Sequence, residues 1–460
     1  MRSVLLELRI ILHSRMAGCA LALLLALASL AIWNGQRAVA AQAAALERLS
    51  AAHQNDHKAF IAKHARGGDA GTAAYYGFHL TWDPPPPLAF IAFGQRDLQP
   101  AALRVRMLGL HSQLYESETL NPELVLLGKF DFAFVLVYLV PLFVIALTHD
   151  WITAERESGR LRLLMSLPLQ SGKLWRRRAW LRYGLVMAAV LLPLATGLLL
   201  ASPSLESAAG VVVVTMLYSA FWMGAGILAG ALARSSAAAA AGLLGLFVII
   251  TLVLPTLANA AINRQVPVGK GVELAMAQRQ EVHQGWDLPK NVVMENFFRT
   301  HPEWRGTPPV AGRFHWKWYY AMHQVGDEAV SGQASEYADS MMRREEWTRR
   351  SAWLMPAAAA QLALHRLADT DLQAQIAYRD SIAEFHARLR RYFYPLLFME
   401  RRFGTREAEG LPVFQPRPAS GSMPLSMIGA LLSAVALVAA AGFIAVRRIS
   451  PVLRGDCMTA

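Results

Sequence analysis

The chain is poor in cysteine and in charge. Only two cysteines occur among 460 residues, Cys19 within an apolar run and Cys457 near the C-terminus. Neither falls in the long polar regions, so we expect no disulfide framework. Charged residues make up only 17% of the chain, whereas 54% of the residues are hydrophobic. This length and balance are typical of a protein that is part membrane bundle and part globular domain.

Motifs for catalysis are also lacking. The sequence contains no H-E-x-x-H, no paired C-x-x-C and no G-x-S-x-G. The tetrapeptide SGKL at 171–174 lacks the upstream glycine and the following hydroxyl of a phosphate-binding loop, so it does not cradle a nucleotide in that way. We therefore predict that the chain is not an enzyme by itself and binds no cofactor of its own.

The formal net charge of +12 raises the question of a nucleic-acid partner. The positions of the basic residues argue against one, because the basic stretches either flank apolar segments or lie in regions predicted to be outside the cytoplasm. We expect contact with membrane lipid and none with nucleic acid.

Long apolar runs are abundant. Six stretches have the length of about 20 mostly apolar residues that crosses a bilayer. They are 16–34, 130–149, 182–201, 209–232, 237–259 and 424–446. The first could be taken for a signal peptide, but it is longer than the usual apolar region of about 7–15 residues, so we expect an uncleaved anchor. In the fourth, the small residues of GAGILAGALA (224–233) would let helices approach closely.

Lysine and arginine in the short loops predict how these spans are oriented. Basic residues occur in the N-terminal segment, in the loop at 150–181, at Arg234 and in the C-terminal tail. The short loop around 202–208 has Glu206 and neither lysine nor arginine. We therefore predict a multi-pass membrane protein with cytoplasmic N- and C-termini and two large extracytoplasmic segments.

The predicted fold class is an all-α polytopic membrane protein, with six transmembrane helices and a mostly helical extracytoplasmic domain. Five parts follow from this layout. They are an N-terminal helix and the first span (1–34), a first extracytoplasmic segment (35–129), spans two to five with the loop 150–181 (130–259), a second extracytoplasmic segment (260–423), and the sixth span with the tail (424–460).

The first extracytoplasmic segment begins with a helical pattern at about 38–65. Four consecutive prolines in WDPPPPLAFIAFGQRDLQP (82–100) then predict a stiff polyproline turn. In the second segment, we predict a loop rich in Gly, Pro and Trp at 285–318, followed by helices at about 327–350 and 357–402. We interpret the charged stretches RREEW (343–347) and RLRRYF (388–393) as salt-bridged helix surfaces.

Two clusters in these segments suggest binding. His53, His57 and His64 could share one helix face and bind zinc or copper, although without an acidic or thiolate companion a solvated polar face is the favoured interpretation. The cluster FHWKWYY (314–320) could stack a ligand, but core packing or an aromatic belt at the membrane interface fits it better.

The charged loop after the second apolar run has a regular layout. Glu155, Arg156 and Glu157 come first, Gly159 permits a turn, and a leucine-rich patch ends at Pro168. A short amphipathic helix of this kind can dock on a cytoplasmic partner or lie on anionic lipid. The residues alone favour neither alternative.

A family resemblance bears on this choice. The stretch ERESGRLRLLMSLPLQSGKLWRRRAW resembles the segment E-R-E-x-G-[TR]-L-x-L-L-L-S-x-P of ABC-2-type transporter permeases. The matching residues are Glu155, Arg156, Glu157, Gly159, Leu161, Leu163, Leu164, Ser166 and Pro168. In that family the segment is a coupling helix that docks on an ATP-hydrolysing subunit. Here Arg160 replaces the usual threonine, which adds a charge to the presumed docking surface.

Other stretches extend the resemblance. VLLELRIILHSRM (4–16) is similar to the elbow helix of these permeases, and 128–147 resembles the second span of the subgroup that includes the permease of nitrous oxide reductase copper-site maturation. PPPPLAFIAFGQRDLQP resembles a related subgroup with large periplasmic insertions.

The resemblance implies a permease subunit of an ABC transporter in a bacterial inner membrane, in the export direction that is the family's tendency. Six spans are half of the usual twelve, so a homodimer or a sister permease is implied, together with a partner ATPase that holds ATP and Mg. The alternative is a membrane-anchored scaffold or sensor whose helical external domain binds a partner protein.

Overall fold

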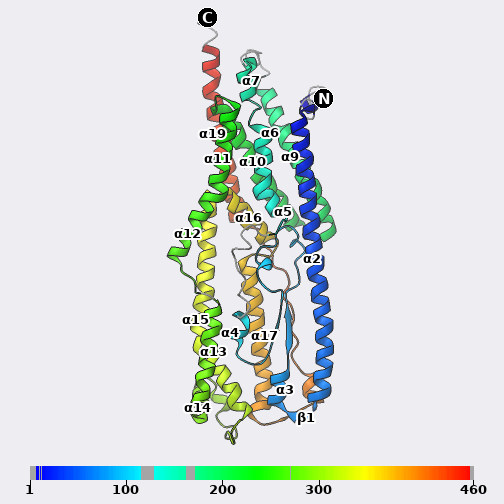
Figure 1. Cartoon of the computed structure of the whole chain (residues 1–460), viewed down its shortest axis with the longest axis vertical. Helices are drawn as coiled ribbons and strands as arrows, with labels where there is room; N and C mark the ends of the chain where they lie inside the picture. Colours follow the sequence, from blue (N-terminus) through cyan, green and yellow to red (C-terminus); the bar gives the residue numbers. More distant parts are fainter. Residues whose placement is uncertain are drawn as a thin grey trace.

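The computed structural model describes residues 7–9, 11, 13–115, 129–161, 171–269 and 271–455. The molecule is elongated and mostly helical. Both termini and the short helix α7 (Thr153–Glu157) lie at one end, which we call the terminal end (Figure 1).

Six helices in the described residues are long and apolar enough to cross a membrane, as the sequence predicted. We call them the candidate spans. They comprise α2 (Arg15–His64), the run α5–α7 (Phe132–Glu157), α9 (Ser171–Ala201), α10 (Leu205–Leu232), the run from α11 to α12 (Ser236–Gln265), and α19 (Leu425–Gly455).

Helix α10 is the centre of the bundle of spans, where it packs against α6 (Val140–Thr148) and α19. The small residues predicted to allow close approach do so, because a Cβ added at Gly226 would lie 2.4 Å from Oγ1 of Thr148. The second span contains a π-helical turn, η3 (Val135–Leu139). The fully buried Tyr218 of α10 donates its hydroxyl to the Val137 carbonyl oxygen in that turn, at 2.9 Å.

Helix α2 does not end where the first apolar run ends. It continues without interruption for 50 residues to His64, a length of about 75 Å at 1.5 Å per residue. The helical pattern predicted at about 38–65 is therefore confirmed, but it is the lower part of the first span rather than a separate helix. The boundary predicted after residue 34 thus falls inside a helix.

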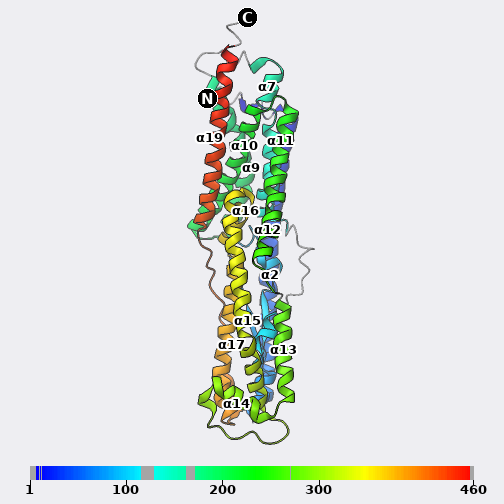
Figure 2. The same ribbon diagram turned by 90° about the vertical axis from the view of Figure 1, so that its left-hand side faces the viewer.

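The second span starts with α5 (Phe132–Phe134), and the fifth span divides into α11 (Ser236–Val248), the π-helical η4 (Ile249–Val253) and α12 (Leu254–Gln265). Away from the terminal end lies a second body, which we call the distal half. It is built from the lower part of α2 and residues 65–115 and 266–423 (Figures 1 and 2).

The long helices of the distal half are α13 (Gly271–Asp287), α14 (Lys290–Thr300), α15 (Trp316–Ser351), α16 (Pro356–Leu367) and α17 (Leu372–Phe398). Shorter elements are α3 (Ala70–Tyr76), α4 (Leu110–Tyr115), α18 (Thr405–Glu409), and the 3₁₀ turns η1 (Gly94–Asp97), η5 (Pro302–Trp304) and η6 (Ala352–Leu354).

Two antiparallel ribbons, which the all-α prediction did not include, tie this half together. Strand β1 (Arg66–Asp69) pairs with β4 (Arg402–Gly404), and β2 (His79–Trp82) pairs with β3 (Ala102–Val105). In the second ribbon Leu80 lies opposite Arg104. Because β1 and β4 come from the two different segments, the distal half is one body assembled from both.

Two predicted boundaries in the second segment are wrong. The stretch 285–318 is not all loop, since it contains α14, which buries Val293, Met294 and Phe297. The helix predicted at 357–402 is two helices, because Asp369 adopts a φ of 53° between α16 and α17. That left-handed conformation cannot continue an α-helix.

The segment after the four prolines joins the two halves. Residues 88–93 are almost fully buried, and the Ile91 carbonyl oxygen accepts a hydrogen bond of 2.9 Å from the backbone of Ala133 at the start of the second span. Together with α16 they extend the hydrophobic core of the candidate spans. A second core fills the distal half.

Candidate functional sites

Glu157 fixes the start of the fifth span. Its carboxylate accepts hydrogen bonds from the backbone nitrogen of Ser236, at 2.8 Å, and from the Ser236 hydroxyl, at 3.1 Å. Ser236 is the first residue of α11, so a negative charge lies at a helix N-terminus, where unpaired N–H groups favour it. The Ser236 hydroxyl also lies 2.9 Å from that of Thr153.

Arg156 binds the end of the fourth span. Its guanidinium donates to the carbonyl oxygen of Ala231, at 3.1 Å, and to that of Ala233. These carbonyl groups belong to the last turn and the C-cap of α10, where a cation is favourable.

Glu155 connects the loop to the third span and the N-terminal segment. Arg178 of α9 lies 3.4 Å from the Glu155 carboxylate and 3.1 Å from that of Glu7. Arg160, which stands where threonine is usual in the family, pairs with the same Glu155 at 2.9 Å. Its added charge is therefore partly neutralised within the chain.

Glu155, Arg156 and Glu157, which we call the span clamp, thus hold α9, α10 and α11 to the end of the second span. The sequence resemblance identified these residues but gave no indication that they point at the chain's own helices. Gly159 has a φ of 72°, which a glycine tolerates best, and none of the described residues lies within 4 Å of its Cβ position. Leu161 is buried. The predicted residues Leu163, Leu164, Ser166 and Pro168 lie outside the described residues, as does most of the elbow stretch 4–16.

The three histidines of α2 do not form a metal site. The rings of His53 and His57 lie 6.2 Å apart, while His64 stacks on Tyr76 with ring centres separated by 5.6 Å. Among the described residues no group of three or more His, Cys, Asp or Glu side chains could hold a metal ion. The three rings are half-buried and two of them stack on Phe60 and Tyr76, so the favoured interpretation of a solvated polar face is wrong as well.

The FHWKWYY cluster is part of the distal core. Trp318 and Tyr320 are buried, and Trp318 packs edge-on against Trp286 with ring centres 4.8 Å apart. Lys317, also fully buried, pairs with Glu400 at 2.7 Å. The cluster begins α15, whose 36 residues separate it by about 54 Å from the end that meets the spans. Core packing explains it, and a membrane-interface belt does not.

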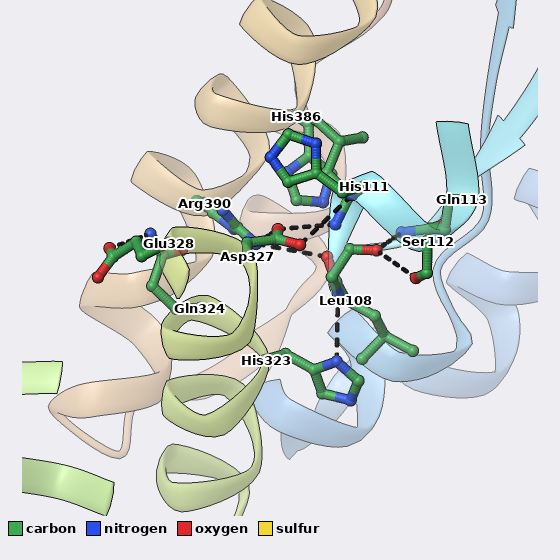
Figure 3. Close-up of polar contacts among 12 residues, drawn as sticks. Leu108, His111, Ser112, Gln113, His323, Gln324, Asp327, Glu328, His386 and Arg390 are labelled. Carbon is green, nitrogen blue, oxygen red and sulfur yellow. Dashed lines mark hydrogen bonds and ion pairs between the residues drawn. The ribbon is translucent and has the colours of Figure 1, made fainter. Parts of the chain in front are cut away.

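A buried polar network lies at the middle of the distal half (Figure 3). Asp327 of α15 pairs with Arg390 of α17 at 2.5 Å and accepts hydrogen bonds from the backbone nitrogens of Leu110, at 2.7 Å, and His111, at 3.3 Å. It therefore binds the start of α4 and a neighbouring helix at once. Burial alone would raise the pKa of Asp327, but Arg390 and the Leu110 N–H group outweigh it and lower the pKa.

Two histidines extend this network. Nδ1 of His323 accepts a hydrogen bond of 3.3 Å from the Gly109 backbone, and Nε2 of His386 donates to the Arg106 carbonyl oxygen at 3.0 Å. Burial lowers the pKa of His323 to about 4 and that of His386 to about 3. Both rings are therefore neutral at pH 7, and no side chain in the network is arranged as a nucleophile with its base. We interpret it as a structural tie.

The network corrects one sequence interpretation. RLRRYF was expected to be a salt-bridged surface, but Arg390 within it is a buried ion-pair partner. Its partner Asp327 lies 63 positions earlier in the chain. A single sequence offers no periodicity that connects residues so far apart.

Comparison with known proteins adds one match. A family model for a domain of unknown function, DUF3526, matches residues 272–417, which run from α13 past α18. The match covers much of the distal half and none of the first five spans. No curated protein and no solved structure matches the chain.

Proposed function

We propose that this chain is the permease subunit of an ATP-driven ABC transporter acting in export, with ATP hydrolysed by a separate subunit. The observation that carries the proposal is the span clamp. It links a charged loop to the ends of three other spans, so that a force on the loop reaches them together. The loop resembles the coupling segment of ABC-2-type permeases, and this resemblance is the reason to propose an ATPase as the source of that force.

In this proposal the span clamp transmits movement to the spans, and the segment that follows it docks on the ATPase subunit. The side chains of Glu155, Arg156 and Glu157 pair with or hydrogen-bond to the chain's own helices. The docking role therefore falls to the leucine-rich stretch 163–168, with Leu163 and Leu164 as the contacts.

The mechanism requires two permease halves, either two copies of this chain or this chain and a sister permease. Binding of ATP and Mg would close two ATPase subunits in the cytoplasm, and each loop would move with its ATPase. The clamp would then tilt the spans of an inner-membrane bundle whose termini are cytoplasmic. ATP can drive this only if the docking contact differs in free energy between the two conformations.

The test separates docking from transmission. The chain is expressed in its native host, purified through a tag, and assayed for a co-purifying ATPase and for its activity. Leu164→Glu should release the ATPase. Glu157→Ala should retain it but lower the activity of the complex by about five- to tenfold, because a coupling contact typically carries a factor of this size.

Glu206→Ala is the matched control, since Glu206 is an exposed glutamate in the first turn of α10, at the other end of the spans from the clamp. It should change neither association nor activity. If no ATPase accompanies the wild-type chain, the permease proposal fails and the membrane-anchored scaffold takes its place.

A further inference from the structure

A large cavity lies where the candidate spans meet the distal half. Its volume is about 910 Å³, and its wall comes from η1, the end of α4, the start of the second span, α12, α15, α16 and α17. Small-molecule sites typically have volumes of about 300–1,000 Å³. Neither the span clamp nor the Asp327 network lines it.

Most acidic groups in the wall already have partners. Asp97 pairs with Lys129 at 2.7 Å, and Asp371 pairs with Arg366 at 3.0 Å. Asp131 accepts hydrogen bonds from two backbone N–H groups, at 3.1 and 2.9 Å. The contacts of these three groups therefore stabilise the wall of the cavity.

Glu345 is different. Its Oε2 atom is buried and has no hydrogen-bond partner among the described residues. Burial and the nearby carboxylates of Asp371 and Glu346 raise the pKa of Glu345 to about 7. The guanidinium groups of Arg366 and Arg349 lower this pKa but do not outweigh the other causes. The group expected on a salt-bridged surface is thus a carboxylate in the wall of a cavity, and among the described residues it is in no ion pair.

The rest of the wall suits an apolar body. Aromatic and aliphatic side chains from five elements line it, namely Tyr115, Phe134, Tyr138, Tyr337, Met341 and Leu362. The ring of Tyr115 already faces a cation, since the Arg379 guanidinium lies 5.1 Å from its centre. Aromatic faces attract cations, and the ring of Tyr337 meets that of Tyr115 edge-on at 5.5 Å.

We propose that this cavity binds an organic cation, an ammonium group carried on an apolar body, with the Glu345 carboxylate as its counter-ion. An anionic ligand would face Glu345 in a wall whose described residues include more acidic than basic side chains. The acidic members are Asp97, Asp131, Glu345, Asp371 and Asp380, and the basic ones are Lys129, Arg344 and Arg379. A purely apolar ligand would bury the Glu345 carboxylate further without pairing it.

The test compares probes that share one body and differ in the head group. Binding of 4-phenylbutylammonium, 4-phenylbutanol and 4-phenylbutanoate to the full-length chain in a non-ionic detergent is measured by calorimetry. The amine should bind at least about tenfold more tightly than the alcohol, because a charge-assisted pair is stronger than a neutral one, and the acid more weakly still. Binding of the amine near pH 6.5 should release protons, since part of the Glu345 population is protonated in the empty cavity.

Two variants probe the counter-ion and the cavity separately. Glu345→Gln should reduce amine affinity to that of the alcohol and abolish proton release, whereas Glu346→Gln, on the same helix and paired with Arg349 and Arg350, should leave both unchanged. Met341→Trp should block all three probes by filling the space. Thermal unfolding of each variant confirms that it is folded.

The proposal is overturned if no probe binds, if all three bind alike, or if Glu345→Gln binds the amine as tightly as the wild type. No ATPase takes part in the assay, so its outcome is independent of the permease proposal.

Discussion

His323 and His386 make the distal half sensitive to acid. The Nδ1 atom of His323 can accept the Gly109 hydrogen bond only while it carries no proton. His386 is almost completely buried beside Arg390, which together with burial opposes a second positive charge. Folding therefore requires two neutral imidazoles, and protons that bind them favour the unfolded chain.

We expect the distal half to lose stability as the pH falls. Both folded-state pKa values, about 4 and about 3, lie below the ordinary value of 6.5. The unfolded chain therefore binds more protons in the window from about 6.5 down to about 4. The stabilisation is fully present above that window and declines within it by up to about 1.4 kcal/mol per pH unit for each histidine.

The measurement is the thermal unfolding midpoint from pH 7.5 to 4.5 for the wild type, His323→Asn and His283→Asn. The Oδ1 atom of an asparagine can replace the acceptor of His323 without binding a proton, so the slope should decrease. His283 is exposed, and its variant should keep the wild-type slope. Glu345, whose raised pKa acts in the opposite sense, is common to all three proteins and cancels in the comparison. Equal slopes in all three would contradict the assignment.

At the residue scale the sequence predicts which residues matter better than it predicts where they point. The Glu155–Arg156–Glu157 motif is recognisable from its order and spacing. Its orientation toward Ser236 and Ala231 depends on where α10 ends and α11 begins, and those ends meet the loop only in the folded bundle. Glu345 belongs to a charged run like its neighbour Glu346, and only the packing of α15 separates the cavity-facing carboxylate from the ion-paired one.

At the scale of elements, α2 and the 88–93 segment are in unusually close contact. A Cβ added at Gly35 would lie 2.1 Å from the Phe90 carbonyl oxygen, a distance that real Cβ atoms do not show. Gly197 of α9 also faces the Phe90 ring, since its added Cβ would lie 2.6 Å from the ring. The Phe90 segment therefore fits between α2 and α9 because both helices have a glycine, without a side chain, where they contact it.

We predict that Gly35→Ala destabilises the protein although alanine is the better helix former. Replacement of glycine by alanine inside a helix should stabilise it by about 1 kcal/mol, but overpacking against a backbone oxygen costs about 1–3 kcal/mol. The unfolding midpoint should therefore fall. Gly242→Ala in α11 is the control, because no described residue lies within 4 Å of its added Cβ, and its midpoint should stay or rise. A rise for both variants would show that α2 and the Phe90 segment are not in contact.

Most elements were predictable because each carries its own signal. Apolar runs of sufficient length located all six candidate spans. The sequence does not predict that α2 continues beyond residue 34, because the apolar run ends there while the helix does not. The break at Asp369 carries neither glycine nor proline. It is stabilised by tertiary contacts, since Arg417 and the Ser420 backbone both bind the Asp369 carboxylate, at 3.2 and 2.9 Å.

At the scale of the whole molecule, α2 belongs to both halves. Its upper part packs on α9 in the bundle of spans, and its lower part contacts α3 and the β1 and β2 strands of the distal half (Figure 1). Helix α16 likewise shares the core of the spans while α15 and α17 extend from it into the distal half. The two halves are thus joined by continuous helix and by shared core, which favours movement as one body.

This rigidity predicts a single distance along α2. With Cys19 and Cys457 replaced by serine, spin labels at the exposed positions Ala22 and Lys58 should give one narrow distribution centred near 54 Å, from a rise of about 1.5 Å per residue. Ala43→Pro lies between the labels on an exposed position. It removes a hydrogen bond at a cost of about 3 kcal/mol and bends the helix, so the distribution should shorten and broaden. Ala43→Ser should leave it unchanged. A broad or double distribution in the unsubstituted protein would mean that α2 bends near residue 34 and that the two halves move separately.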